Sequence, residues 1–218
     1  MASKVDICNY ALANIRAQSI NSIDEASINA QYCKLKYDLV LDFMLRDTLW
    51  NFARKQQALA LVTDDLFDWV YAYQYPSDCL KINRLMSIAE KISAAEEGFV
   101  FRPEYYKQDF LRQKPIVPFA VLNVGSNRVI GANSDQLWID YQIKVEDPNL
   151  YDSHFTMALV WYLTAEIAIP VIGGDQGRAE RKAALQMYQV SMDTAIASNA
   201  DERDNGDPLE SDFINIRS

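Results

Sequence analysis

The chain has few of the residue types on which most enzyme and metal sites depend. Its 218 residues include one histidine, His154, and three widely separated cysteines, Cys8, Cys33 and Cys79. One histidine without paired cysteines argues against a metal site built from nitrogen and sulfur ligands. A site made only of carboxylates stays open, but no acidic run has calcium-loop spacing, and we predict no metal, no cofactor and three free thiols. Cys8 and Cys33 fall on apolar helical faces and should be buried, and His154 should have a structural role.

Motifs for nucleotide binding and nucleophilic catalysis are also missing. The glycine-rich segment 173–177 follows no predicted strand and lacks the lysine of a phosphate-binding loop. No Gly-x-Ser-x-Gly segment occurs. With 30 acidic residues, two carboxylates of any spacing could meet in the fold, so glycoside hydrolysis stays open as an alternative. The favoured interpretation is a protein that is not an enzyme.

Basic residues are outnumbered, 21 to 30, which gives a net charge of −9. This balance argues against a protein that binds nucleic acid through its phosphates, but it is compatible with a surface past which DNA slides. No apolar run approaches the roughly 18 residues of a membrane span, and residues 1–6 lack a secretory apolar core. We expect no membrane contact and a cytosol-like compartment.

Helical periodicity dominates both ends of the chain. The pattern predicts helices over residues 4–17, with Ser3 as the N-cap, and over residues 26–46. A third predicted helix, 153–169, is apolar nearly all round, and Pro170 should end it. The fourth covers residues 175–198, and the residues predicted on its apolar side are Ala179, Ala183, Met187, Val190 or Ser191, and Thr194.

Between these helices the period changes to two, and residues 63–146 are predicted to be mainly strands. Four aromatic residues alternate and should form one aromatic sheet face packed under helices: Trp69, Tyr71, Tyr73 and Tyr75. Residues 137–145 also alternate cleanly. A long loop is expected near residues 98–118, and residues 50–62 fit either a helix or a strand.

These patterns together predict an α+β fold with an inserted, mainly antiparallel β region. Residues 1–62 and 147–199 each supply a helix pair, and the simplest way to cover their apolar faces is a four-helix bundle. Residues 200–218 form a separate polar tail with six acids and two arginines, hence a net charge of −4. Its last ten residues nevertheless include four apolar side chains.

Four segments carry a resemblance to a known family. They are Ile7-Cys8-Asn9-Tyr10-Ala11-Leu12, Trp50-Asn51-Phe52-Ala53, Tyr71-Ala72-Tyr73-Gln74-Tyr75-Pro76-Ser77-Asp78-Cys79-Leu80 and Asp147-Pro148-Asn149-Leu150-Tyr151-Asp152, which leads into residues 158–168. In this order they resemble the tail tubular protein A family, the head-to-tail adaptors of short-tailed bacteriophages. Residues 89–118 show no pattern of that family.

The resemblance implies a structural virion protein that is assembled in the host cytoplasm. Its copies would form a ring, typically of twelve, between the portal protein and the tail nozzle protein (tail tubular protein B type). Genome DNA would pass through this ring without specific binding. The tail would be a flexible arm that docks on the portal, with apolar anchors Leu209, Phe213, Ile214 and Ile216, and with Asp212 and Arg217 setting the register.

Two other functions are compatible with the residues. One is a tail-associated polysaccharide hydrolase that uses acidic residues for catalysis and the aromatic face as a sugar platform. The other is a small-ligand binding module. Loss of activity on single acid substitutions, with assembly intact, would indicate the hydrolase. A saturable ligand and a monomeric chain would indicate the binding module.

Overall fold

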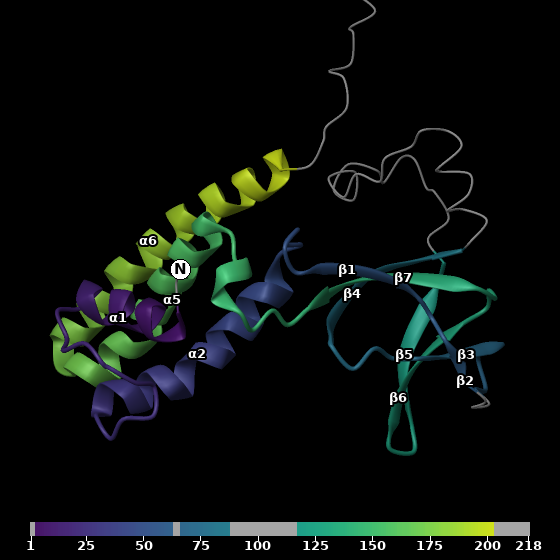
Figure 1. Ribbon diagram of the computed structural model, residues 1–218, viewed down its shortest axis with the longest axis horizontal. Coiled ribbons are helices and arrows are strands. Elements are labelled where there is room, and N and C mark those ends of the chain that lie inside the picture. The colour runs from purple at the N-terminus through teal and green to yellow at the C-terminus, as the bar shows by residue number, and fades with distance from the viewer. Residues whose placement is uncertain (1–2, 63–65, 88–116, 203–218) are drawn as a thin grey trace, which may run out of the picture.

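Helices from the two ends of the chain form one lobe, and the strands between them form the other (Figure 1). The computed structural model describes residues 3–62, 66–87 and 117–202. Within these ranges lie four α-helices and two antiparallel sheets. The predicted α+β class is therefore confirmed. The predicted loop at 98–118 and the tail residues 203–218 fall outside the described residues, apart from Val117 and Pro118.

Helix α1 covers Lys4–Asn14 and begins in a capping box. The Ser3 hydroxyl accepts a hydrogen bond from the Asp6 N–H at 3.1 Å, while the Ser3 N–H donates to the Asp6 carboxylate at 2.9 Å. These bonds lower the pKa of Asp6. The helix ends earlier than predicted because Arg16 adopts a left-handed conformation (φ 55°) and the Ala17 N–H returns to the Leu12 carbonyl.

Helix α2 covers Ile28–Asp47, with Ser27 as its N-cap. After the strands and a short 3-10 helix, Pro148–Leu150, helix α5 runs over Ser153–Ile172 from its cap at Asp152. The predicted break at Pro170 is wrong, because the proline lies inside the last turn and the helix continues to Ile172. Helix α6, Gly174–Asp201, starts directly after Gly173, whose φ is +76°.

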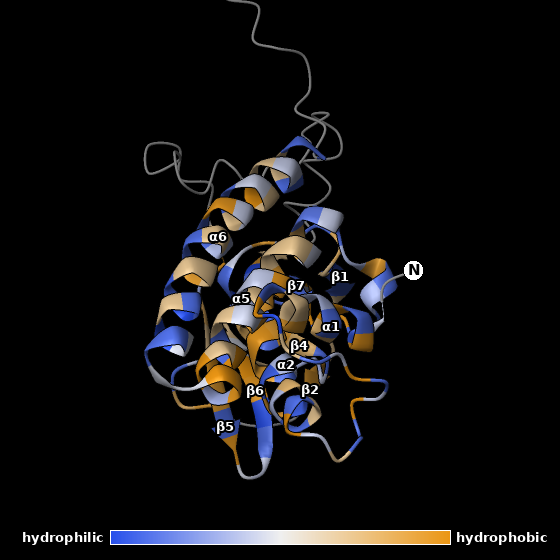
Figure 2. Cartoon of the chain, turned by 90° about the vertical axis from the view of Figure 1, so that its left-hand side faces the viewer, coloured by the Kyte–Doolittle hydropathy of each residue, from blue (hydrophilic) through white to orange (hydrophobic). Residues whose placement is uncertain are grey.

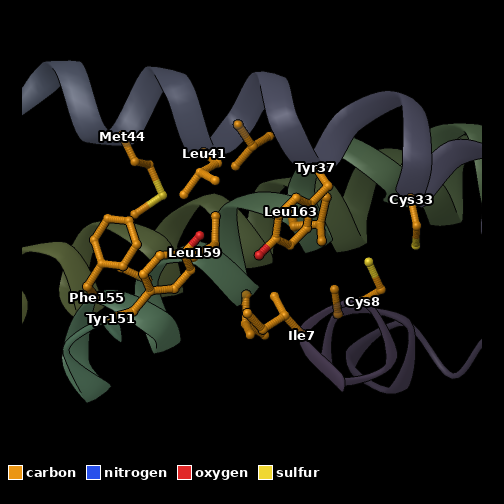
Figure 3. Close-up of a cluster of buried hydrophobic side chains, with 14 of the residues drawn as sticks. Ile7, Cys8, Cys33, Tyr37, Leu41, Met44, Tyr151, Phe155, Leu159 and Leu163 are labelled. Atoms are coloured by element: carbon orange, nitrogen blue, oxygen red, sulfur yellow. The ribbon is translucent and has the colours of Figure 1, made fainter. Parts of the chain in front are cut away.

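Helix α5 is the centre of the helical lobe. It packs along α6, α2 and α1, whereas α1 and α2 touch only briefly and α6 has no extended contact with either among the described residues. Figure 3 shows Tyr37, Leu41 and Met44 of α2 meeting Phe155, Leu159 and Leu163 of α5, with Ile7 of α1 completing the cluster. Three helices thus surround a fourth, and the regular four-helix bundle is not confirmed.

The strand lobe consists of two small sheets, both antiparallel. One has the order β1-β7-β4 and the other β2-β3-β6-β5. The strand bounds are Arg54–Ala58 (β1), Leu61–Val62 (β2), Tyr71–Gln74 (β3), Cys79–Ser87 (β4), Phe119–Val124 (β5), Asn127–Ala132 (β6) and Leu137–Ile143 (β7). Strands β1 and β2 occupy residues that the sequence grouped with the helices. Lys55, Gln56 and Gln57 give no local strand signal, and pairing with β7 decides their conformation.

The two sheets pack against each other around a second hydrophobic core. Leu137, Ile139 and Tyr141 point from β7 into this core, which confirms the predicted alternation. They meet Tyr73 of β3, Leu85 of β4 and Ile130 of β6. The sheet face predicted to lie under helices therefore lies under the other sheet, since each sheet has one apolar face that needs covering.

Candidate interaction surfaces

The aromatic ladder is divided between two faces of its sheet. Tyr73 is fully buried in the core between the sheets, where Tyr71 and Tyr75 pack partly against it. Trp69 precedes β3, and its ring lies over Gly131, where a Cβ atom would approach to 2.7 Å. Gly131 alternates with the inward-facing Ile130 and Ala132, so Trp69 covers the opposite face. The single four-residue face is wrong, because β3 begins only at Tyr71.

The tyrosine hydroxyls hold turns and strand ends. Tyr73 donates to the Ser134 carbonyl at 2.7 Å, and Tyr141 donates to Asp78 at 3.0 Å. Lys55 forms an ion pair with the same Asp78 at 2.7 Å. Burial raises the pKa of Tyr75 to about 12. With these rings buried or engaged, the ladder offers no continuous platform on which a sugar could stack.

The segments that carry the family resemblance lie at structural junctions. The Asn9 side chain donates to the Ile20 carbonyl at 2.9 Å and accepts from the Ile20 N–H at 2.8 Å, which fixes the link between α1 and α2. Trp50 is fully buried and donates to the Met44 carbonyl at 2.9 Å. Asp152 caps α5 through the N–H groups of His154 and Phe155. His154 itself is exposed.

One asparagine anchors the end of α6 to the junction between the lobes. Asn199 is buried; its carboxamide accepts from the Asn51 N–H at 2.8 Å and donates to the Leu49 carbonyl at 2.8 Å. The Asn51 side chain donates to the Asn199 carbonyl at 2.7 Å. This set of bonds, the Asn199 clamp, fixes the position from which the C-terminal tail departs. The clamp could not be found from sequence, because its partners are about 150 positions apart.

A buried carboxylate organises the outer face of the β1-β7-β4 sheet. Asp140 is fully buried and accepts hydrogen bonds from Arg54 at 3.0 Å, Gln56 at 2.9 Å and Asn83 at 3.1 Å. These donors come from β1 and β4, the two strands that flank β7. Asp140 therefore joins three strands electrostatically. Both of its oxygens accept hydrogen bonds from the protein itself.

The cysteines are free thiols, and Cys8 and Cys33 face each other between α1 and α2 (Figure 3). The hydrogen bond with Cys33 and burial raise the pKa of Cys8. Within residues 3–62, 66–87 and 117–202, no group of three or more His, Cys, Asp or Glu side chains is arranged to hold a metal ion.

Helix α2 carries an exposed apolar stripe opposite its core face. Ile28, Leu35 and Leu39 expose 64%, 66% and 66% of their surface, and Phe43 exposes 48%. With the partly buried Tyr32 they recur at steps of four, three, four and four residues, so they align along one side of the helix. We call these five residues the α2 stripe. Scattered exposed leucines are ordinary, but a continuous line of large apolar side chains marks an interaction surface.

Helix α6 also has an exposed face with an apolar pattern. Its buried side is formed by Gly177, Ala184, Met192, Ala195 and Asn199. The face predicted to enter the core points outward instead, with Met187 43% and Val190 62% exposed. We call Ala179, Ala183, Met187, Val190 and Thr194 the α6 face. The prediction was wrong because the opposite side of α6 packs against α5. Gly177 lies on that side and, having no side chain, lets the two helices approach closely.

An open depression of about 570 Å³ lies where α6 crosses α5. It is lined by Ile169 and Leu185 together with polar residues Arg178, Arg181, Lys182, Gln186 and Gln189. Arg178 pairs with Asp175 at 2.6 Å, and Arg181 pairs with Glu166 at 3.3 Å. Glu166 also binds Lys36 of α2 at 3.0 Å. These ion pairs connect α2, α5 and α6 across the surface.

By length and composition alone, α5 could cross a membrane, with a mean hydropathy of 1.7 over its most apolar part. Half of that part is buried, and α5 contacts the other three described helices. Its apolar surface thus already has protein partners, which is typical of a core helix. From the sequence we expected no apolar run long enough for a membrane span. Helix α5 has that length and hydropathy, so this expectation was wrong.

No protein-family description matches this chain, and no curated protein matches it.

Proposed function

We propose that this chain is a structural subunit of a head-to-tail adaptor ring in a short-tailed bacteriophage virion. It would lie between the portal protein and the tail nozzle protein, and its copies would surround the channel through which DNA leaves. The observation that carries the proposal is the α2 stripe. A helix that is apolar on both sides requires a neighbour on its outer side as well as a core on its inner side.

The polar side chains named above already form hydrogen bonds and ion pairs within the protein, which supports a structural role over a catalytic one. Asp140, Asp78 and Glu166 are held by neighbouring cations or amides, and Asn199 ties α6 to the link between α2 and β1. Such networks stiffen a subunit that must keep its shape under the load of assembly. The ordered resemblance to tail tubular protein A supplies the kind of assembly, and the net charge of −9 suits a conduit that does not retain DNA.

The portal would be bound through the C-terminal tail. Its apolar anchors would be Leu209, Phe213, Ile214 and Ile216, with Asp212 and Arg217 giving polar register. These residues lie outside the described structure. The tail follows α6, whose last turn is fixed by the Asn199 clamp. A fixed point of departure raises the effective concentration of a short binding segment near its target.

The test is to mix the purified chain with portal rings and to measure the size of the product. We expect a stable complex for the full chain and none after deletion of residues 205–218, with both chains giving the same circular dichroism. A matched pair of single variants refines the test: Phe213→Asp should abolish the complex, whereas Ser211→Ala should leave it unchanged. Normal binding of the truncated chain would show that the tail is not the anchor. Absence of any complex at every salt concentration would refute the adaptor function.

A further inference from the structure

We propose that Cys8 and Cys33 form an oxidation site, at which a peroxide converts the two free thiols into a disulfide that ties α1 to α2. This chemistry is independent of the adaptor function, because it involves neither the C-terminal tail nor the α2 stripe. The physical basis is that the two thiols are paired with each other, closed off from solvent and placed where two helices have little other contact.

The two sulfur atoms point toward each other between the helices. Cys8 lies on the buried side of α1 and Cys33 on the buried side of α2, and both residues are fully buried. Figure 3 shows the two side chains directed at one another, with no other labelled side chain between them. A hydrogen bond joins the thiols. The sulfurs are therefore already neighbours, and a covalent bond requires only that they move to about 2 Å from each other.

Helix α1 is held loosely enough to make this movement. It has 11 residues and packs mainly on α5, and its contact with α2 is brief. Helix α6 lies on a different side of α5 (Figure 2) and has no extended contact with α1 among the described residues. A bond between Cys8 and Cys33 closes a loop of about 25 residues. It would add a covalent tie where the packing between α1 and α2 is sparse.

The hydrogen bond decides which thiol reacts first. Donation from Cys8 lowers the pKa of Cys33, while the same bond and burial raise the pKa of Cys8. Cys33 is thus the thiol that ionises, and the thiolate is the reactive form of cysteine. Because both thiols are buried, a molecule as small as hydrogen peroxide reaches them more readily than a bulky disulfide reagent does.

The oxidation consists of two steps that balance in atoms and electrons. The Cys33 thiolate attacks one oxygen of the peroxide, the O–O bond breaks, and Cys33 becomes a sulfenic acid. The hydroxide that leaves takes up the proton that Cys33 released and becomes water. The Cys8 sulfur then attacks the Cys33 sulfur, the S–O bond breaks, and a second water leaves with the Cys8 proton. One peroxide is thereby reduced to two waters, and the two thiols are oxidised to one disulfide.

The bond would distinguish two environments of the chain. In a reducing cytoplasm both thiols stay free, and after release into an oxidising medium the disulfide forms. This change of environment rests on the proposed function, whereas the reaction itself does not. Once closed, the disulfide lies in the core of the helical lobe, where a reductant has poor access.

Peptide mass spectrometry tests the bond directly. Tryptic digestion releases Cys8 in residues 5–16 and Cys33 in residues 17–34, so the two thiols lie on separate peptides. The folded full chain with Cys79→Ser is treated with hydrogen peroxide. We expect the two peptides to be joined with loss of two hydrogen atoms, and to separate again after reduction with dithiothreitol. On a non-reducing gel the product should migrate as a single chain.

Thermal unfolding gives an independent readout. Closing a loop of this length should raise the Tm of the oxidised Cys79→Ser chain by roughly 5–10 °C relative to its reduced form. The matched control, Cys8→Ala with Cys79→Ser, should give neither linked peptides nor a rise in Tm after the same treatment.

Several outcomes would overturn this inference. Peptides that stay separate after peroxide treatment would show that the two sulfurs do not meet. Linkage that appears only when the peroxide is added in urea would show that they meet only in the unfolded chain. Linkage with an unchanged or lower Tm would show that the bond does not brace the helices. Absence of portal binding would refute the adaptor function but leave this oxidation site unaffected.

Discussion

Replacement of Asn199 by alanine should loosen the attachment of α6 to the link between α2 and β1. The substitution removes two hydrogen bonds made by the carboxamide, one from the Asn51 N–H and one to the Leu49 carbonyl, both 2.8 Å long. The site is only 5% exposed, so water replaces these bonds poorly. The hydrogen bond from the Asn51 side chain to the backbone carbonyl of residue 199 remains. The end of α6 should therefore stay helical but lose its fixed position.

The size of the effect follows from the number and burial of the lost bonds. A typical internal hydrogen bond contributes about 1 kcal/mol, and burial of the groups left behind increases the loss. We expect the free energy of unfolding to fall by about 2–3 kcal/mol. For a chain of this length that corresponds to a fall in Tm of roughly 4–12 °C. Urea unfolding followed by circular dichroism measures the first quantity, and calorimetry measures the second.

Thr194→Ala is the matched control on the same helix. The Thr194 hydroxyl donates to the Val190 carbonyl at 3.0 Å, but the residue is exposed, so the change should stay within about 0.5 kcal/mol. If Asn199→Ala also stayed within that range, the clamp would contribute nothing to this attachment. The proposed fixed departure point of the tail would then lose its physical basis.

Two further predictions concern helix packing and ionisation. Gly177→Ala should lower the stability by about 1–3 kcal/mol in thermal unfolding, because its Cβ would lie 3.1 Å from the Ala168 carbonyl and force α5 and α6 apart; an increase in Tm would contradict this packing. Burial raises the pKa of Tyr151 and Tyr188 to about 12, from an ordinary 10.0. Their stabilising contribution is thus complete below pH 10 and disappears as the pH approaches 12. The part of the tyrosinate absorbance that a Tyr188→Phe variant lacks should rise together with loss of helical circular dichroism, and an earlier rise of that part would disprove the burial.

The sequence predicted the helices well because their signals are local. Ser3 and Asp152 cap α1 and α5, and periodic apolar residues such as Cys33, Tyr37 and Met44 mark the buried side of α2. The alternation in β7 was equally reliable, since one of its faces is buried against the other sheet. In each case the residue pattern and the tertiary environment favour the same structure.

The candidate surfaces were less predictable. Both sides of α6 have helical apolar spacing, and the sequence prediction chose the side that faces outward. In the structure the buried side of α6 is the one that contains Gly177. Because glycine has no side chain, α5 can approach α6 closely at this position. The outer apolar side of α2 was not recognised at all, since periodicity cannot show which of two apolar faces the core covers. That information exists only when the neighbouring helices are in place.

The amino-acid sequence by itself determined the α+β class, the main helices, the alternating strand β7 and the scarcity of residues suited to metal binding. These properties depend on composition and on contacts between residues close in the chain. Tertiary structure alone decided that the tyrosines lie between two sheets, that Asn199 ties α6 to the link between α2 and β1, and which helical faces stay exposed. These features depend on partners 60 to 150 positions apart, and pairing at such distances leaves no periodic trace in the sequence.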